Sequence, residues 1–266
     1  MLPSLFQVSA RPWPYAALTR GLDAGDAREG VWIRADPVHL SVDSGAVRLL
    51  AAGTLGLEQA QCSALLRSLA PLLGDAGLQL SVAHPERWYL RAQAGTTLPD
   101  FTAPWCALGE DLRPHLPKGP DAARWHRLLN ESQMLLHQHP VNLARAAAGK
   151  PAANSLWFWG AGAWPARVGT RLSAVASEDS LLLAMAKAAG IAHGLTLAGH
   201  TVGCAALDLR AAREPVALDR DWIEPAERAV RSGQVRSLEV IFADGASVQL
   251  SRAGAFSFWR RSRALE

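Results

Sequence analysis

Apolar and polar residues alternate along residues 31–50 (VWIRADPVHLSVDSGAVRLL). Ser44-Gly45 interrupts the alternation with a turn signal, so this stretch predicts an extended strand followed by a hairpin. Residues 57–74 instead place their apolar side chains at helical spacing and end at Gly74, which predicts a helix.

Two shorter alternating stretches, LQLSVA at residues 78–83 and RWYLRAQ at residues 87–93, predict two further strands. The order of strand, hairpin, helix and two strands indicates an antiparallel α+β unit over residues 30–117, with the helix covering one face of the sheet. Residues 1–29 are expected to be an N-terminal lead-in. Residues 94–120 are rich in proline and predict a linker that wraps towards the next unit.

A long helix is predicted from about Pro120 to His137. His139-Pro140 should end it, because proline disfavours helical geometry in the residue before it. Asn142 is a suitable N-cap for a second, short helix that stops at Gly149.

The stretch SLWFW at residues 155–159 is an uninterrupted apolar run, as is typical of a strand buried on both faces. Trp157 and Trp159 are expected on opposite sides of it. A helix over residues 178–189 and another buried strand, CAALDL at residues 204–209, give the second half an α/β character.

A helix at residues 221–232, a hairpin at 238–251 that turns at Asp244-Gly245, and a basic terminal helix complete the chain. Residues 118–266 should therefore form an α/β unit with a short buried sheet and a C-terminal hairpin. The predicted fold class is mixed α/β, with the antiparallel α+β unit first.

The composition is that of a globular protein, because 49% of the 266 residues are apolar and 19% are charged. No run of about 18 apolar residues predicts a membrane span, and the start of the chain lacks the basic region of a signal peptide. Cys62, Cys106 and Cys204 are widely spaced, which fits thiols in a reduced, cytoplasmic setting. The net charge is only +3 and basic residues concentrate only in the terminal FSFWRRSRALE, so nucleic acid is not an expected partner.

The glycines that follow the tryptophan-rich run are the first candidates for function. Gly160 and Gly162 would let the backbone approach a ligand closely, as loops at the carboxyl ends of strands do in α/β sheets. The chain has neither GxxxxGK[ST] nor GxGxxG, so no nucleotide motif supports this reading. The alternative is that the glycines only turn the chain and the tryptophans are core.

The order of several motifs resembles a known family. RADPVHLSVDSG, RWYLR and LLNESQMLLHQHPVNLARAAAGKPAANSLWFWGAGAWP follow one another here, as similar segments do in the middle section of archaeal-type cofactor-independent phosphoglycerate mutases. The resemblance covers about residues 30–190 and is most specific from Asn130-Glu131 to Gly162. The chain also resembles the shorter proteobacterial proteins known as RpfE-type regulatory proteins.

The resemblance implies the alkaline phosphatase superfamily, whose mutases use two divalent metals and a serine nucleophile. This chain departs from that pattern, because the first 29 residues contain no Asp-Gly. After Gly190 the only histidines are His193 and His200, with no carboxylate four residues before either. The resemblance therefore implies a substrate-cap part without the metal centre, and we expect no catalytic residue, metal or other cofactor.

Four arginines form a candidate anion clamp, because a guanidinium suits bidentate contact with phosphate or carboxylate. The alternative is that they are solvated ends of strands and a helix. Asp36 stands where the family has asparagine, and its carboxylate would repel an anionic phosphoglycerate unless Arg34 pairs with it. Asn142 and Asn154 have capping and strand-edge roles as equal alternatives to ligand contact, and Asn130 belongs to a polar stripe of the long helix that meets the sheet or lines a groove. The candidate ligand-binding residues are Arg34, Asp36, Arg87, Arg91, Asn130, Asn142, Arg145, Asn154, Gly160 and Gly162.

Three hypotheses about function follow. The first is a regulatory or ligand-binding module that lacks the metal centre and binds a small phosphorylated or carboxylated metabolite, or a protein partner. The second is an enzyme, either a mutase or phosphatase whose missing groups come from a partner chain or an enzyme with a different, metal-free chemistry. The third is a protein-interaction scaffold that uses a tryptophan-rich surface. The first hypothesis further predicts that the Gly160–Gly162 loop, Arg34 and Asn142 line a mouth between the two units.

Overall fold

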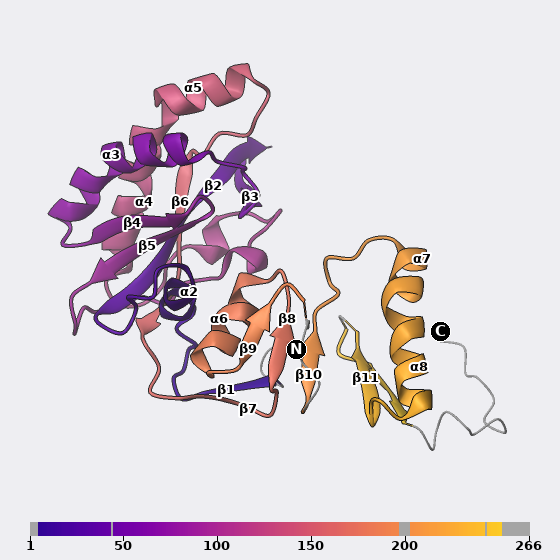
Figure 1. Ribbon diagram of the computed structural model, residues 1–266. Coiled ribbons are helices and arrows are strands. Elements are labelled where there is room, and N and C mark those ends of the chain that lie inside the picture. Colours follow the sequence, from indigo (N-terminus) through magenta and orange to yellow (C-terminus); the bar gives the residue numbers. More distant parts are fainter. Residues whose placement is uncertain (1–4, 44, 197–202, 243, 252–266) are drawn as a thin grey trace.

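The computed structural model describes residues 5–43, 45–196, 203–242 and 244–251. Its main sheet is antiparallel and is built around one long strand, β2 (Val31–Asp43). β6 (Ser155–Ala163) pairs with β2 along one edge, while β5 (Arg87–Ala92) pairs with residues 31–34 and β3 (Ala46–Ala52) with residues 38–43. β4 (Gln79–His84) pairs with β5 (Figure 1). The predicted hairpin and the two following strands are confirmed.

One face of this sheet is covered by α3 (Gln59–Asp75) and α4 (Ala122–His137), both of which the sequence predicts. Inward-facing residues of the strands, among them Ile33, Leu90 and Phe158, form a common apolar core with these helices. The alternation of apolar residues along each strand thus decides which side chains face the helices.

The short helix α5 (Pro140–Ala147) follows α4, as predicted, but its cap differs from the prediction. The N-cap is His139, whose Nδ1 accepts a hydrogen bond from the Val141 N–H at 3.2 Å. Pro140 occupies the first helical turn, where its missing N–H costs nothing. Asn142 therefore lies inside the helix, and its side chain is buried.

The opposite face of the sheet is covered by α2 (Tyr15–Asp23), which contacts β2, β4 and β6. Ahead of α2, β1 (Phe6–Val8) pairs antiparallel with β7 (Val168–Thr170). α2 also packs on α6 (Ser180–Ala188), so the stretch predicted as a lead-in lies between the antiparallel sheet and the second half of the chain.

β6 comes from the second predicted unit but is hydrogen-bonded into the sheet of the first. Its first five residues are buried on both faces, as predicted. Trp157 and Trp159, however, lie on the same face in one apolar cluster, and Phe158 lies on the other. The expectation that the two tryptophans face opposite sides is wrong, because residues two apart in a strand share a face. The boundary at residues 117/118 stays a prediction.

A second, parallel sheet contains β8 (Ala174–Ala176), β9 (Ala192–Gly194) and β10 (Ala205–Leu207) in the order β10-β8-β9. α6 connects β8 to β9. β8 is buried, but β10 is not the buried strand that the sequence predicts, since Ala205 is exposed and its neighbours are only partly covered. The mixed α/β fold class is confirmed.

The remaining elements form a small unit at the C-terminal end, which comprises residues 215–251. It contains α7 (Pro215–Leu218), a π-helical turn η3 (Asp219–Ile223) and α8 (Glu224–Ser232), followed by the hairpin of β11 (Ser237–Ile241) and β12 (Ser247–Ser251). The predicted helix and hairpin are confirmed, whereas the predicted basic terminal helix lies outside the described residues.

Two short 3-10 turns, η1 (Pro104–Cys106) and η2 (Arg113–His115), lie in the proline-rich segment. In the described part of the chain, no helix has the length and apolarity needed to cross a membrane.

Candidate functional site

A connected group of polar side chains lies under α2, on the sheet face that α2 covers. Arg34 and Asp36 are two apart on β2 and are both buried, with exposed fractions of 5% and 4%. The Arg34 Nε donates to Asp36 Oδ1 at 2.8 Å, and a second guanidinium nitrogen lies 2.8 Å from Oδ2. This is a bidentate ion pair almost free of solvent.

Asp36 receives two more hydrogen bonds. The Trp159 indole Nε1 donates to Oδ2 at 2.7 Å, and the Trp88 backbone N–H donates to Oδ1 at 3.2 Å. Burial raises the pKa of the Asp36 carboxyl, and Arg34, Trp159 and Trp88 oppose that rise. All of these partners are donors, so the contacts fit the ionised carboxylate.

A second ion pair lies beside the first. Arg87 donates to both oxygens of Asp23, at 2.8 and 2.7 Å, and the Tyr89 hydroxyl donates to Asp23 at 2.5 Å. Burial acts to raise the pKa of Asp23, but the bonds from Arg87 and Tyr89 outweigh it and hold the pKa below its usual value. Burial is also the main reason that the pKa of Tyr89 is raised. We call Asp23, Arg34, Asp36, Arg87 and Tyr89 the buried ion-pair cluster.

Aromatic rings enclose the Arg34 guanidinium. Its central carbon lies 5.3 Å from the centre of the Tyr89 ring and 5.0 Å from that of Trp159. The Thr19 hydroxyl of α2 accepts a 3.3 Å hydrogen bond from the same guanidinium. Within the described residues, every charge of the buried ion-pair cluster thus has an opposite charge next to it in the same chain.

The predicted anion clamp does not assemble. Arg34, Arg87 and Arg91 do share the α2 side of the sheet, but Arg91 lies at an exposed end and is 3.4 Å from Glu29. Arg145 lies elsewhere, on α5, where its guanidinium donates to the carbonyls of Leu55 and Pro151. It is 1% exposed, so its contacts tie α5 to the loop before α3.

The glycines make the predicted close backbone approach, but to the N-terminal segment of the same chain. Both lie within strand β6, not in a loop, and have positive φ angles of 64° for Gly160 and 155° for Gly162. A Cβ at Gly160 would lie 2.9 Å from the Tyr15 Cβ, and one at Gly162 would lie 2.6 Å from the Pro14 Cβ. The start of α2 therefore fills the space in which a ligand was expected.

The asparagines lie apart from that space. Asn142 bonds to Leu136 O and to both backbone groups of Ala153, and it thereby joins α4, α5 and the approach to β6. From Ala153 to Gly160 an extended chain covers about 20 Å, so Asn142 and Gly160 do not share one mouth.

The other two asparagines also lie away from Gly160. The Asn154 side chain bonds to the N–H and C=O of Leu40 at 2.8 and 2.7 Å, as a neighbouring strand would. Asn130 is exposed on α4.

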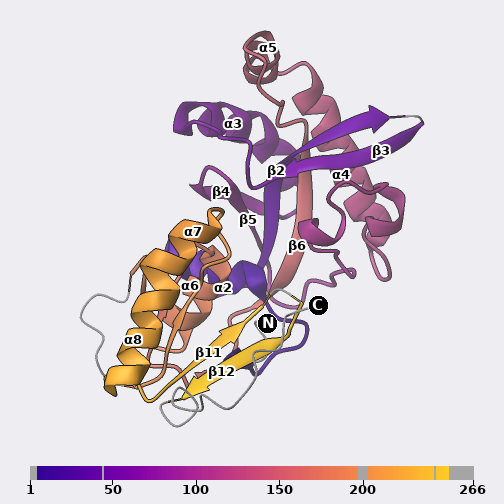
Figure 2. The same cartoon turned by 90° about the vertical axis from the view of Figure 1, so that its right-hand side faces the viewer.

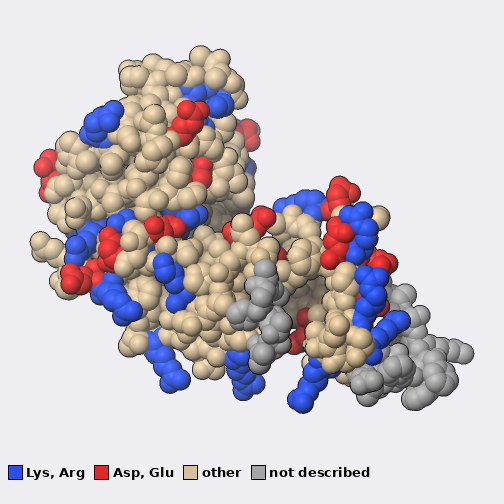
Figure 3. Space-filling view, in the orientation of Figure 1, with Lys and Arg blue, Asp and Glu red and all other residues tan. Residues whose placement is uncertain are grey.

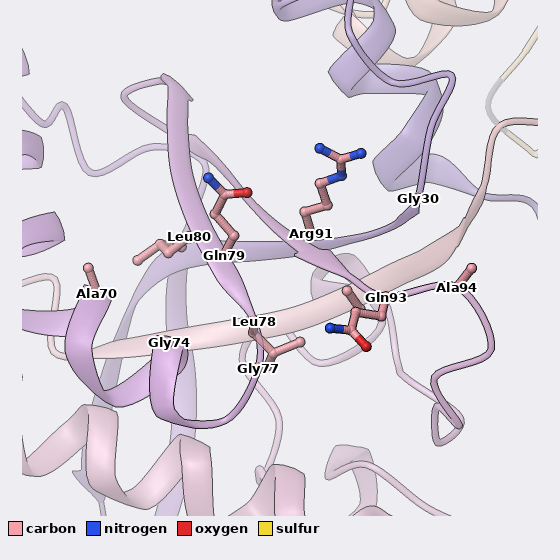
Figure 4. A pocket seen from close by; sticks show the side chains of 11 residues that line it. Gly30, Ala70, Gly74, Gly77, Leu78, Gln79, Leu80, Arg91, Gln93 and Ala94 are labelled. Carbon is pink, nitrogen blue, oxygen red and sulfur yellow. The ribbon is translucent and has the colours of Figure 1, made fainter.

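An open groove of about 670 Å³ lies at the outer end of β4 and β5, between them and the C-terminal end of α3. Gln79 and Arg91 are register partners on the two strands, and Figure 4 shows both side chains rising on the same side. Arg91 is thus the one candidate residue that lines this groove.

Two members of the buried ion-pair cluster, Asp23 and Tyr89, are absent from the set that the sequence predicts. The alternation of RWYLR places Arg87 and Tyr89 on one face of a strand, so the sequence pattern is sufficient to predict that Tyr89 lies beside Arg87. Nothing local to Asp23 shows that it reaches them, because it comes from the stretch read as a lead-in.

Among the described residues, no group of three or more histidine, cysteine, aspartate or glutamate side chains could hold a metal ion. Ser177, Asp179, Asp208 and Arg210 form a separate polar group beyond β8 and β10, in which Arg210 bonds to both aspartates. The hydrogen bond from Arg210 lowers the pKa of Asp208 to about 2.

No family model matches the chain. It is similar to a probable 2,3-bisphosphoglycerate-independent phosphoglycerate mutase of Geobacter sulfurreducens, with 26% identity over 196 residues, 74% of this chain and 46% of that protein. A 2,3-bisphosphoglycerate-independent phosphoglycerate mutase of Methanosarcina barkeri is 30% identical over 145 residues, 52% of this chain and 36% of that protein. The chain is homologous to part of these mutases. It spans less than half of the length of either relative.

Among solved structures, the cofactor-independent phosphoglycerate mutase of Thermoplasma acidophilum aligns with a TM-score of 0.42 and 18% identity, over 82% of this chain and 64% of that chain.

Proposed function

We propose that the protein is a phosphoglycerate mutase-related module with a regulatory or binding role towards a protein partner. In this proposal it does not catalyse the mutase reaction by itself. The observation that carries this proposal is the buried, bidentate pair of Arg34 with Asp36. An anionic substrate would need the guanidinium face that Asp36 already occupies.

The rest of the buried ion-pair cluster supports the same reading. Asp23 neutralises Arg87 in the way that Asp36 neutralises Arg34, and α2 lies over both pairs. A phosphoglycerate entering here would meet two carboxylates, and like charges at this depth are costly to bring together.

The proposed setting is the cytoplasm. Cys62, Cys106 and Cys204 are all free thiols, which is compatible with a reducing compartment. The proposed partner is a protein, because the arginines expected to hold a small anion are engaged within the chain. Most tryptophans in the described part of the chain are buried, but Trp105, Trp222 and Phe242, exposed by 56%, 42% and 40%, are aromatic residues that a partner could reach.

The test uses the full chain with added Mn²⁺ and 3-phosphoglycerate, and the appearance of 2-phosphoglycerate is followed through coupled enolase. We expect no rate above buffer, no heat of 3-phosphoglycerate binding in calorimetry, and no growth of a mutase-deficient strain that carries the gene. Turnover of 3-phosphoglycerate that Arg34→Ala abolishes, with an unchanged circular dichroism spectrum, would overturn the proposal.

A further inference from the structure

Strand β4 forms an outer edge of the main sheet. Figure 2 shows it outermost, followed by β5, β2 and β6. Within the described part of the chain, β4 pairs with β5 alone. The edge of β3 is covered differently, because the N–H groups of Gly109 and Leu112 each donate to a β3 carbonyl at 2.7 Å. The protein thus covers the edge of β3 with its own chain, and no such segment of the described chain lies along β4.

Two residues of β4 direct their backbone groups away from β5. The N–H of Leu78, just before the strand, donates to Leu73 O of α3 at 2.9 Å, so it points away from β5. Backbone groups alternate in direction along an antiparallel strand, so those of Leu80 and Val82 point the same way. In the described part of the chain, these N–H and C=O groups have no hydrogen-bond partner. They are therefore available to a further strand.

The β4 edge has little of the protection that exposed strands usually carry. Its sequence, Gln-Leu-Ser-Val-Ala-His, contains no lysine, arginine, carboxylate or proline, and its one irregularity is a bulge between Val82 and His84. The groove of about 670 Å³ lies beside its first half, where Ala70 and Gly74 of α3 form part of the wall and leave room for another chain. Figure 3 shows mostly uncharged surface over α3 and β4, with a band of mixed acidic and basic side chains below them.

We propose that the protein forms a symmetric dimer in which β4 of one protomer pairs antiparallel with β4 of its partner. The two-fold axis passes beside Ser81, so that Leu80 of each protomer exchanges backbone hydrogen bonds with the partner's Val82. The two main sheets then become continuous across the axis, with α3 of both protomers on the same face.

The free backbone groups select this register. Pairing centred on Ser81 uses both Leu80 and Val82 and requires no other residue to give up a bond. Pairing centred on Leu80 would need the Leu78 N–H, which Leu73 already binds, and pairing centred on Val82 would run into the bulge. On the α3 side the chosen register places Leu80 against the partner's Val82, and both side chains already belong to or pack on the apolar core.

Charge permits the contact between two copies. On the α2 side of the sheet, Arg20 donates to the Ser81 hydroxyl at 3.0 Å and to both carboxylate oxygens of Asp26 at 2.6 Å. Each Arg20 therefore meets its counterpart as part of a neutral pair. The Asp26 side chain is 54% exposed, so it can also reach the partner's Arg20. Two unpaired like charges would oppose the pairing, and this register brings none together.

The first test measures the molar mass of the full chain by light scattering after size-exclusion chromatography, over loading concentrations from about 1 to about 100 µM, where small interfaces dissociate. Wild type should approach twice 28.5 kDa as the concentration rises. Ser81→Lys places two ammonium groups at the axis and should raise the dissociation constant at least about tenfold. Ser81→Ala is the matched control, because it also loses the bond to Arg20 but adds no charge, and it should remain dimeric.

The second test is disulfide cross-linking, which does not depend on the fold tolerating a lysine. Residues opposite each other at a non-hydrogen-bonded position are about 4.5 Å apart at Cα, within the reach of a disulfide, so Ser81→Cys should give a covalent dimer on mild oxidation. Gln79→Cys is the control, because Gln79 lies opposite the partner's Ala83 and the two thiols would be more than about 10 Å apart. Wild type, in which Cys106 and Cys204 are exposed, gives the background.

A monomeric wild type throughout the concentration range would overturn the proposal and would leave the edge to a strand of another protein. A dimer that Ser81→Lys does not weaken, or that Ser81→Ala weakens equally, would overturn it too. So would a Ser81→Cys variant that cross-links no more than Gln79→Cys or wild type.

Discussion

Replacing Asp36 with alanine should expose how much of the stability depends on the buried ion-pair cluster. The substitution leaves the Arg34 guanidinium 5% exposed and without its carboxylate, and it removes the acceptor of the Trp159 indole N–H. Removing one partner of a buried pair costs about 3–5 kcal/mol, because the remaining charge stays desolvated. This is a large part of the about 5–15 kcal/mol by which a domain is stable.

The assay is urea unfolding at neutral pH, followed by tryptophan fluorescence and circular dichroism. Arg34→Met combined with Asp36→Ala should be more stable than Asp36→Ala alone, because the uncompensated charge is gone. Added acetate should raise the melting temperature of Asp36→Ala more than that of wild type, since the variant leaves a carboxylate-sized space beside Arg34. Glu29→Ala is the control. Its carboxylate is 88% exposed beside Arg91, and its loss should change stability by less than about 0.5 kcal/mol.

If Asp36→Ala lowered the unfolding free energy by less than about 1 kcal/mol, the reasoning would be refuted, since that is the contribution of a solvent-exposed ion pair. It would mean that water reaches Arg34 and that the guanidinium is available to ligands after all. The proposal that the arginines are closed to an anion would fall with it.

Three further predictions concern other parts of the chain. Gly160→Ala should destabilise the protein, because the new Cβ would lie 2.9 Å from the Tyr15 Cβ, and limited proteolysis should then cleave the N-terminal segment faster. Gly74→Ala is the control: it lies on helix α3 with no atom within 4 Å of the new Cβ, and it should stabilise the protein by about 0.5–1 kcal/mol. Trp157→Ala should cost about 3–5 kcal/mol in urea unfolding, as its side chain is 3% exposed, and unchanged stability would place it at the surface. Asp208, with a folded pKa of about 2 against 3.8, contributes stability that is complete above its unfolded pKa and is lost as pH falls towards 2. The unfolding free energy that is lost between about pH 4 and pH 2 should therefore be smaller in Asp208→Asn than in wild type, by about 1 kcal/mol after solvent screening. The same loss in both proteins would contradict the assignment.

Local pattern was sufficient for most elements of the fold. The alternation at residues 31–50 and the helical spacing at 57–74 predict β2, β3 and α3 because each signal lies within one element. The partners of β6 were not predictable in this way, since a buried apolar run carries no information on which sheet receives it. β6 joins a strand more than a hundred residues earlier in the chain.

The candidate site shows the same division. The sequence raises the question of whether Asp36 pairs with Arg34, because residues two apart on a strand share a face, and the structure shows that it does. It does not reveal that Asp23 neutralises Arg87, because that contact spans 64 positions and depends on where α2 docks. The same docking places Tyr15 against Gly160, which no local motif encodes.

The position of α2 also governs the order in which the protein can fold during synthesis. β1 and α2 are made before the sheet, yet Phe6 pairs with Thr170 and α2 packs on α6, so these two partners are made more than 150 residues later. Until then α2 can contact β2 and β4, but it lacks the contacts with β6 and α6 that complete its packing over Arg34 and Arg87. Contacts of such long sequence separation slow folding, because a long loop must close before they form. The nascent chain therefore passes through a stage in which α2 has met only some of its partners, and this is the stage at which a chaperone would have most to protect.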